Sequence, residues 1–262
     1  FGESGVGWAT FLAQGIAGVL AVITLLRRVA KLPTGHGKVM LYSKSMLRRI
    51  AKIAVPSILQ QSFVSVGNIF IQSLVNSFGS AVIGGYSAAI KLNTFTITSF
   101  STLGNALSSF SAQNIGAAKI DRVRKGFRAG TMLAWIIAVP FFVLFFFFGN
   151  EMLRIFMENP TGGAMKAGME FLKIVSPFYF IISLKLLADG LLRGSSAMIG
   201  FMVSTFTDLI LRVILAYVFA GLFGSTGIWM SWPVGWSISA IISLLFYRYT
   251  WKQLSVERRL LK

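Results

Sequence analysis

The basic residues of this chain are confined to alternate connections between long hydrophobic segments. Nineteen of the 25 lysine and arginine residues lie at positions 27–52, 119–128, 193 and 248–262. The three intervening loops together hold only Arg154, Lys166 and Lys173. Because the cytoplasmic loops of multispanning membrane proteins carry an excess of lysine and arginine, this alternation predicts a chain that crosses a bilayer repeatedly and in one orientation.

Seven segments are long enough to cross about 30 Å of hydrocarbon as α-helices, which predicts an all-α membrane protein. We expect these spans at residues 8–26, 53–78, 81–112, 131–148, 171–192, 198–222 and 228–249. The third is the least hydrophobic, so of the seven it is the one that a hydropathy window detects least easily. The fourth contains the run 141–148, which has no polar side and is therefore expected to face lipid. Trp8, Trp229 and Trp251 lie near span ends, where interfacial tryptophans are common.

The parity of the basic loops also predicts the orientation. The loops after the first, third and fifth spans and the C-terminal tail are expected in the cytoplasm, and the loops after the second, fourth and sixth outside. The N-terminus of this chain is then external, which predicts further helices upstream because no signal sequence is present.

In the first cytoplasmic loop, residues 44–53 have apolar residues on one side and basic residues on the other. This pattern predicts an interfacial amphipathic helix that leads into the second span.

Composition argues against several other classes of protein. Only 13% of the residues are charged and 55% are hydrophobic, whereas soluble domains carry roughly 25% charged residues. The net charge of +17 would suggest nucleic-acid binding in a soluble protein, but here the charge is segregated by loops, so no nucleic-acid partner is expected. The sequence has no cysteine, HExxH, GxSxG or Walker A motif, and we expect neither an enzyme nor a metal site.

Two of the expected spans carry stripes of polar residues at helical spacing. In the third span, steps of three and four residues place seven polar side chains on one face: Ser87, Lys91, Thr94, Thr98, Ser101, Asn105 and Ser108. The second span carries Gln61, Ser65, Asn68, Gln72 and Asn76 in the same way. Small polar residues also hold membrane helices together, which is the alternative interpretation. Two adjacent stripes favour a polar cavity, with Gln61, Asn68, Gln72, Lys91 and Asn105 as its candidate lining.

Five ionisable residues lie inside the expected spans, where an unpaired charge costs several kcal/mol. They are Lys91, Lys185, Asp189, Asp208 and Arg212. Lys185 and Asp189 are four residues apart, as are Asp208 and Arg212, so each pair can be neutralised on its own helix. Such a pair either fixes helix packing or supplies a carboxylate whose proton or cation occupancy responds to conformation, and both interpretations remain open. Lys91 has no acid on its own helix and lies near the outer end of its span, where its side chain can snorkel.

Short motifs occur in order along nearly the whole chain. They read GVGWAT at 5–10 followed by Gln14, AVPSILQQ at 54–61, QNIGAA at 113–118, DGLLRG at 189–194, and GIWMSWP at 227–233. In sequence and spacing they resemble the sixth, seventh, eighth, tenth and twelfth helices of the multidrug and toxic compound extrusion (MATE) family. Each motif is weak alone, but five in the right order with matching loop parity make the resemblance specific.

The resemblance implies a transporter of two six-helix bundles that face each other around a substrate cavity. Such proteins export drugs and organic cations by proton or sodium antiport, with rocker-type alternating access. This chain then corresponds to the last helix of the N-terminal lobe (1–30), a basic linker with an amphipathic helix (31–52), the six-helix C-terminal bundle (53–250) and a basic tail (251–262). The implied partners are the lipid bilayer, a small organic substrate and the N-terminal lobe. A monomer in the inner membrane of the cell is implied, with a coupling ion but no cofactor.

The sequence departs from that family in one respect. Many members carry a cation-binding acid on the seventh helix, where residues 53–78 offer only glutamine, asparagine and serine. Their acid on the tenth helix lies in its first half, whereas Asp189 comes late. Asp189, with Lys185 beside it, is nonetheless the leading candidate for an ion-responsive carboxylate, ahead of Asp208 and Arg212.

Two alternatives to a drug exporter remain at this point. A flippase for lipids or lipid-linked oligosaccharides, from the same superfamily, needs a cationic cavity that Lys91, Lys185 and Arg212 can supply. A seven-helix receptor that binds without transport also fits an external N-terminus, although the family motifs argue against it.

Overall fold

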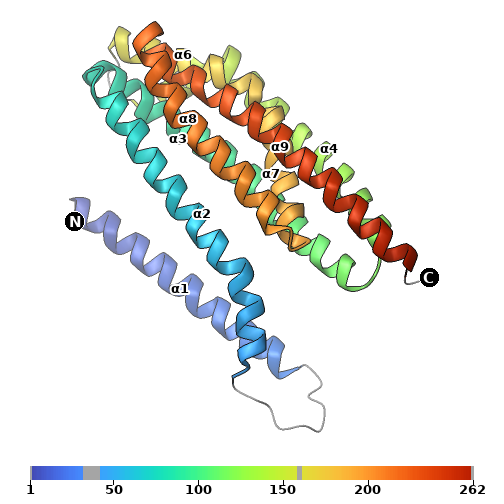
Figure 1. The fold of residues 1–262 in the computed structure, drawn as a ribbon. Helices are drawn as coiled ribbons and strands as arrows, with labels where there is room; N and C mark the ends of the chain where they lie inside the picture. Colours follow the sequence, from blue (N-terminus) through green and yellow to red (C-terminus); the bar gives the residue numbers. More distant parts are fainter. Residues whose placement is uncertain (1, 32–41, 158–160, 261–262) are drawn as a thin grey trace. The chain divides into compact units, whose positions relative to one another are not determined.

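The computed structural model describes residues 2–31, 42–157 and 161–260, and all regular structure in these ranges is helical (Figure 1). The predicted all-α membrane fold is confirmed. Among the described helices, six segments are long and apolar enough to cross a membrane, namely Gly7–Ala30, Lys44–Asn76, Ile120–Phe147, Gly162–Gly194, Met198–Phe223 and Ser225–Leu254. Helix α3 (Ser80–Gly116) has 37 residues but is not among them, because its polar stripe lowers its hydropathy, as expected from the sequence.

The chain divides into two compact units, Phe1–Arg48 and Arg49–Lys262. The first contains α1 (Gly2–Ala30), which ends with Arg27 and Arg28 in its last turn. Cations at this position interact favourably with the helix C-terminus. Residues 32–41 of the predicted basic linker lie outside the described ranges.

Helix α2 (Lys44–Asn76) joins the predicted amphipathic segment and the second span in one element. No boundary separates residues 44–53 from the span, since no glycine or proline precedes Pro56 in this helix. Within the second unit, α2 packs through its C-terminal half, where Gly67, Ile71 and Val75 are its buried residues. Gly67 makes the approach to α8 (Met198–Phe223) possible, because a Cβ there would overlap the side chain of Leu209.

The remaining helices of the second unit form a bundle around α7. They are α3, α4 (Ile120–Phe147), α5 (Gly149–Arg154), α6 (Gly162–Val175), α7 (Tyr179–Gly194), α8 and α9 (Ser225–Leu260). Helix α7 packs against α3, α4, α8 and α9. The predicted fifth span is interrupted at a 3-10 turn, η1 (Ser176–Phe178), because Pro177 has no backbone N–H and disfavours a continuous α-helix. Helix α9 continues past the predicted span end into the tail.

Glycines bring α3 into backbone contact with α6 and α7. A Cβ on Gly190 would overlap the carbonyl oxygen of Gly104, and one on Gly194 would overlap that of Ser108. Gly85 makes the same kind of approach to the carbonyl of Ala164 on α6. Small residues allow close helix packing in membranes, where there is little hydrophobic drive for association. These contacts set the close spacing of α3 with α6 and α7.

Aromatic rings fill the core between α3, α6 and α9. Tyr86 stacks on Trp229 at 5.2 Å between ring centroids, and Phe171 meets the same indole edge-on at 5.3 Å. The prediction that Trp229 is an interfacial anchor is therefore wrong, since its side chain is fully buried. The expectation that residues 141–148 face lipid holds for only part of the run, because some of its side chains are buried. Phe147 is 65% exposed, but Phe145 is 3% exposed and packs against Tyr179.

Two short turns connect consecutive long helices. Gly79 (φ 89°) lies between α2 and α3, and Gly224 (φ 63°) between α8 and α9; both adopt a backbone conformation that favours glycine.

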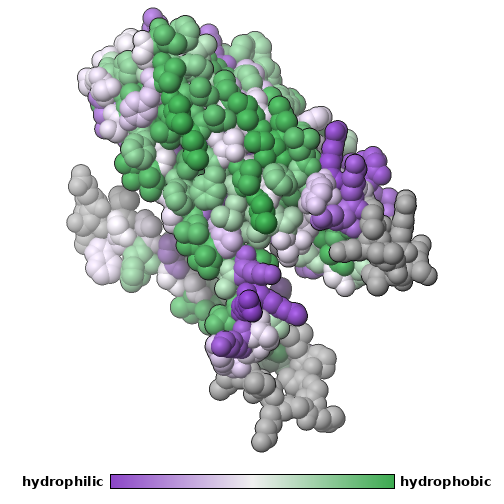
Figure 2. Space-filling view, in the orientation of Figure 1, coloured by the Kyte–Doolittle hydropathy of each residue, from purple (hydrophilic) through white to green (hydrophobic). Residues whose placement is uncertain are grey.

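On the face shown in Figure 2, hydrophobic side chains cover most of the bundle, and hydrophilic ones gather toward helix ends, including the start of α2 and the region where α9 ends. This distribution matches a multi-pass membrane protein.

Candidate functional site

A cavity of about 520 Å³ lies within the second unit, between α2, α3, α7, α8 and α9. Its wall is mixed in chemistry. Amide and hydroxyl side chains come from α2 and α3, aromatic rings from α3 and α9, and charged groups from α7 and α8. Membrane-embedded cavities of this composition hold water or a polar solute, because the polar groups cannot be satisfied by lipid.

The two predicted polar stripes meet at this cavity over the middle of their helices. Gln61, Asn68 and Gln72 line it from α2, and Thr94, Thr98 and Ser101 line it from α3. The amide nitrogen of Gln72 donates to Oδ1 of Asn76 at 2.9 Å, which orients the Gln72 side chain. The polar side chains that share one face of each helix by periodicity therefore lie together in the fold, around this cavity.

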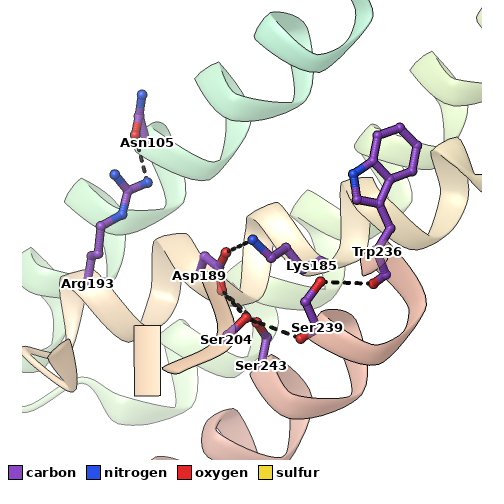
Figure 3. Close-up of polar contacts among 8 residues, drawn as sticks. All are labelled: Asn105, Lys185, Asp189, Arg193, Ser204, Trp236, Ser239 and Ser243. Atoms are coloured by element: carbon purple, nitrogen blue, oxygen red, sulfur yellow. Dashed lines mark hydrogen bonds and ion pairs between the residues drawn. The ribbon is translucent and has the colours of Figure 1, made fainter. Parts of the chain in front are cut away.

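Lys91 and Asn105, which share the α3 stripe, do not line this cavity. Nζ of Lys91 lies 5.8 Å from the ring centroid of Phe156. Oδ1 of Asn105 accepts a 2.8 Å hydrogen bond from Nη2 of Arg193 on α7 (Figure 3). The physical reason is length, since 37 residues of helix extend roughly 55 Å and the cavity occupies only part of that. The ends of the stripe contact other elements.

Asp189 is held in a closed polar network behind the cavity wall (Figure 3). Its Oδ2 lies 2.8 Å from Nζ of Lys185, and both side chains are 4% exposed. Its Oδ1 accepts from Ser243 Oγ of α9 at 2.6 Å and, at 3.5 Å, from Ser204 Oγ of α8. The single hydroxyl proton of Ser204 is shared between this contact and the carbonyl oxygen of Ser239, at 3.2 Å. Both carboxylate oxygens are satisfied, and only Lys185 of this pair lines the cavity.

Asp208 and Arg212 behave differently, although their spacing is the same. No ion pair forms between them, and within the described ranges Oδ1 of Asp208 and Nε of Arg212 are buried without a hydrogen-bond partner. The Arg212 guanidinium lies instead over the indole of Trp232, 4.6 Å from its centroid, which is a cation–π contact. The spacing of Asp208 and Arg212 allows an ion pair, but the structure does not form one. An i,i+4 spacing permits a bridge but does not enforce it when an aromatic face competes for the cation.

Four of the residues that line this cavity also carry a buried polar atom without a hydrogen-bond partner in the described structure. The atoms are Thr205 Oγ1, Asp208 Oδ1, Arg212 Nε and Trp232 Nε1. Leaving such a group unsatisfied costs about 1–3 kcal/mol, so the wall of this cavity holds several polar groups whose hydrogen bonding is incomplete in the described structure. Thr205, Trp232 and Trp236 also line the cavity, and the sequence analysis does not predict them as lining residues. The only signal for them was the i,i+4 spacing of the two tryptophans, which equally describes a core face.

The site has the chemistry of a binding cavity. Aromatic rings of Tyr86, Trp232 and Trp236 offer apolar and cation-binding faces, and the amides of α2 supply donors and acceptors. No group of three or more His, Asp or Glu side chains able to hold a metal occurs in the described part of the chain.

Comparison with known proteins places this geometry in a family. The MatE family model matches residues 56–218. The chain is 28% identical over 260 residues to a probable multidrug resistance protein, YpnP, of Bacillus subtilis (strain 168), covering 97% of this chain and 57% of that protein. It is 21% identical to the multidrug export protein MepA of Staphylococcus saprophyticus, covering 97% and 55%. The chain thus spans little more than half the length of the relatives it matches.

Solved structures agree with the sequence matches at the level of the fold. An outward-facing multidrug resistance MATE family transporter of the MOP superfamily superposes with a TM-score of 0.85 at 18% identity, covering 97% of this chain and 57% of that one. A MOP superfamily transporter from Pyrococcus furiosus gives a TM-score of 0.84 at 17% identity, covering 97% and 57%. With the family match extending over more than half of its residues, this chain is a member of the MatE family of multidrug efflux transporters.

Proposed function

We propose that this chain forms the C-terminal part of a secondary active exporter, which moves amphipathic organic solutes and drugs out of the cell against a proton or sodium gradient. The observation that carries the proposal is the cavity bounded by α2, α3, α7, α8 and α9, whose wall combines aromatic faces, amide side chains and the charged residues Lys185, Asp208 and Arg212. Family membership and relatives named as multidrug resistance or export proteins support the same function.

Rocker-type alternating access and completion of the cavity by an N-terminal lobe are part of this proposal. We also propose that the protein lies in the inner membrane as a monomer, with its basic loops and C-terminus in the cytoplasm. The basic positions 119–128 and 248–262 support this orientation, because moving such clusters across a membrane is unfavourable.

Asp208 is the carboxylate that we propose responds to the coupling ion, in preference to Asp189. Asp208 is a lining residue of the cavity, and one of its carboxylate oxygens has no hydrogen-bond partner in the described structure. Both oxygens of Asp189 are already bound, and Asp189 does not line the cavity. An ion or proton that binds Asp208 changes the charge beside Arg212, and a change of charge in a low-dielectric cavity alters the affinity for an organic cation. Asp189 and Lys185 then hold α7 to α8 and α9.

A lipid or lipid-linked oligosaccharide flippase is the second candidate. One observation favours it, because both Lys185 and Arg212 line the cavity and are cations that suit a phosphate or pyrophosphate. The aromatic rings of Tyr86 and Trp236 in the same wall suit an organic cation instead.

Dye efflux from cells that express the full-length protein tests the proposal. We expect efflux of a cationic dye such as ethidium to depend on the ion gradient, and Asp208→Asn to lower the gradient-dependent rate at least tenfold at equal protein level. Glu151→Gln, at an exposed acid on α5, is the matched control and should leave efflux unchanged. Wild-type coupling in Asp208→Asn would exclude Asp208, and absence of any dye efflux together with movement of labelled phospholipid between leaflets would favour the flippase.

A further inference from the structure

A second hollow lies on the outer surface of the bundle, between α4 and α7. It has a volume of about 590 Å³ and an almost wholly apolar wall that includes Phe127, Trp135, Val139 and Phe180. The indole nitrogen of Trp135 donates to the backbone carbonyl of Phe180 at 3.2 Å, which ties the two helices together along the groove. Met132 and Ile136 beside it are 66% and 58% exposed. In a membrane span, such exposed apolar side chains face lipid.

One end of this groove is basic. Arg128 is the charged residue in its wall, and Arg124 and Lys125 lie one turn earlier on the same side of α4, since three or four residues separate them from it. All three side chains are exposed. From Arg128 to Val139 the groove follows α4 over 11 residue steps, a rise of roughly 16 Å. That length matches one leaflet, which is about half of a 30 Å hydrocarbon core.

We propose that this groove binds one phospholipid with an anionic headgroup. Arg128, with Arg124 and Lys125, binds the phosphate, and an acyl chain lies along α4 against Trp135 and Phe180. Charge complementarity favours this occupant over a second copy of the chain, because another copy would bring its own net charge of +17 toward the same basic end. Basic pockets between membrane helices at the cytoplasmic side bind acidic lipid headgroups in the same way.

The test uses the full-length protein in nanodiscs with dioleoyl phosphatidylglycerol and dioleoyl phosphatidylcholine, which share acyl chains and differ in headgroup charge. The ratio of the two lipids retained after detergent exchange is measured by native mass spectrometry. We expect retention of phosphatidylglycerol over phosphatidylcholine, a loss of about fivefold in that preference in Arg128→Gln, and preservation in Arg128→Lys. Arg122→Gln is the matched control, because Arg122 is exposed on α4 but lies about 120° around the helix from Arg128.

Location is tested separately with phosphatidylglycerol that carries a photoreactive diazirine in its acyl chain. We expect crosslinks on α4 and α7, at Met132, Trp135 or Leu184, and their loss in Ile136→Trp, which fills the groove with a larger side chain. An unchanged lipid preference in Arg128→Gln, an equal loss in Arg122→Gln, or crosslinks spread evenly over all lipid-facing helices would overturn the proposal. Dye efflux is a separate readout, so failure of the exporter proposal leaves this one to stand or fall by itself.

Discussion

Two aspartates with identical local spacing reach different states in this protein. Asp189 and Asp208 each have a cation four residues away, yet only Asp189 forms the ion pair. The difference comes from side chains that are distant in sequence. Ser204 and Ser243 bind the Asp189 carboxylate from α8 and α9, and Trp232 draws Arg212 away from Asp208. Residue spacing predicts which groups are able to pair, but the competing partners decide whether they do.

Asp189→Asn should destabilise the fold, because it leaves the Lys185 ammonium buried without its counter-charge. Removing one partner of a buried pair costs about 3–5 kcal/mol. Thermal unfolding of the detergent-solubilised protein, followed by tryptophan fluorescence, should show a clear drop in midpoint. Lys185→Met combined with Asp189→Leu should recover most of it.

The matched control for this prediction is the exposed pair Lys166–Glu170, with an N–O distance of 4.0 Å and a lysine side chain that is 79% exposed. Lys166→Ala should change the midpoint little, since exposed pairs contribute about 0–1 kcal/mol. Equal effects at the two pairs would contradict the buried, structural role of Asp189.

At the scale of elements, the contact between α3 and α7 depends on the missing side chains of two glycines. Gly190→Ala should destabilise the bundle by about 1–3 kcal/mol or more, because the new methyl group meets the backbone of Gly104, which cannot rotate away. The same unfolding assay measures this effect. Gly221→Ala on α8 is the control, since nothing lies within 4 Å of the added Cβ and alanine favours helix. A stable Gly190→Ala protein would show that α3 and α7 are more loosely packed than described.

Helical periodicity and length were sufficient to predict the long helices and the meeting of the α2 and α3 stripes. They did not predict the interruption at Ser176–Phe178, because many membrane helices accommodate proline as a kink. They also misplace Trp229, whose position near a span end fits a membrane interface as well as a core. Its burial depends on Tyr86 and Phe171, which come from other helices.

The polar stripe of α3 predicts Lys91 and Asn105 in the cavity, but neither lines it. A stripe indicates the face of a helix and not how far along that face a cavity extends.

At the scale of the whole molecule, the alternation of basic loops makes a prediction about orientation. The sequence has no cysteine, so the labelling of a single introduced cysteine shows on which side of the membrane that residue lies. We expect Ser77→Cys, at the exposed turn after α2, to react with a membrane-impermeant maleimide added to intact cells. Lys119→Cys, exposed before α4, should react only after permeabilisation. The reverse pattern would invert the proposed topology.

The helices around the cavity differ in how firmly they are held. Helices α3, α7, α8 and α9 interlock through backbone contacts, aromatic stacking and the Asp189 network. Helix α2 buries only Gly67, Ile71 and Val75 and meets α8 at a glycine. Displacing α2 therefore breaks few contacts, whereas displacing α7 breaks many. The cavity wall formed by α2, which carries Gln61, Asn68 and Gln72, is therefore held by fewer contacts than the wall opposite. For the exporter proposed above, we expect solutes of different size to be accommodated chiefly by movement of α2, while the charged groups of α7 and α8 keep their positions.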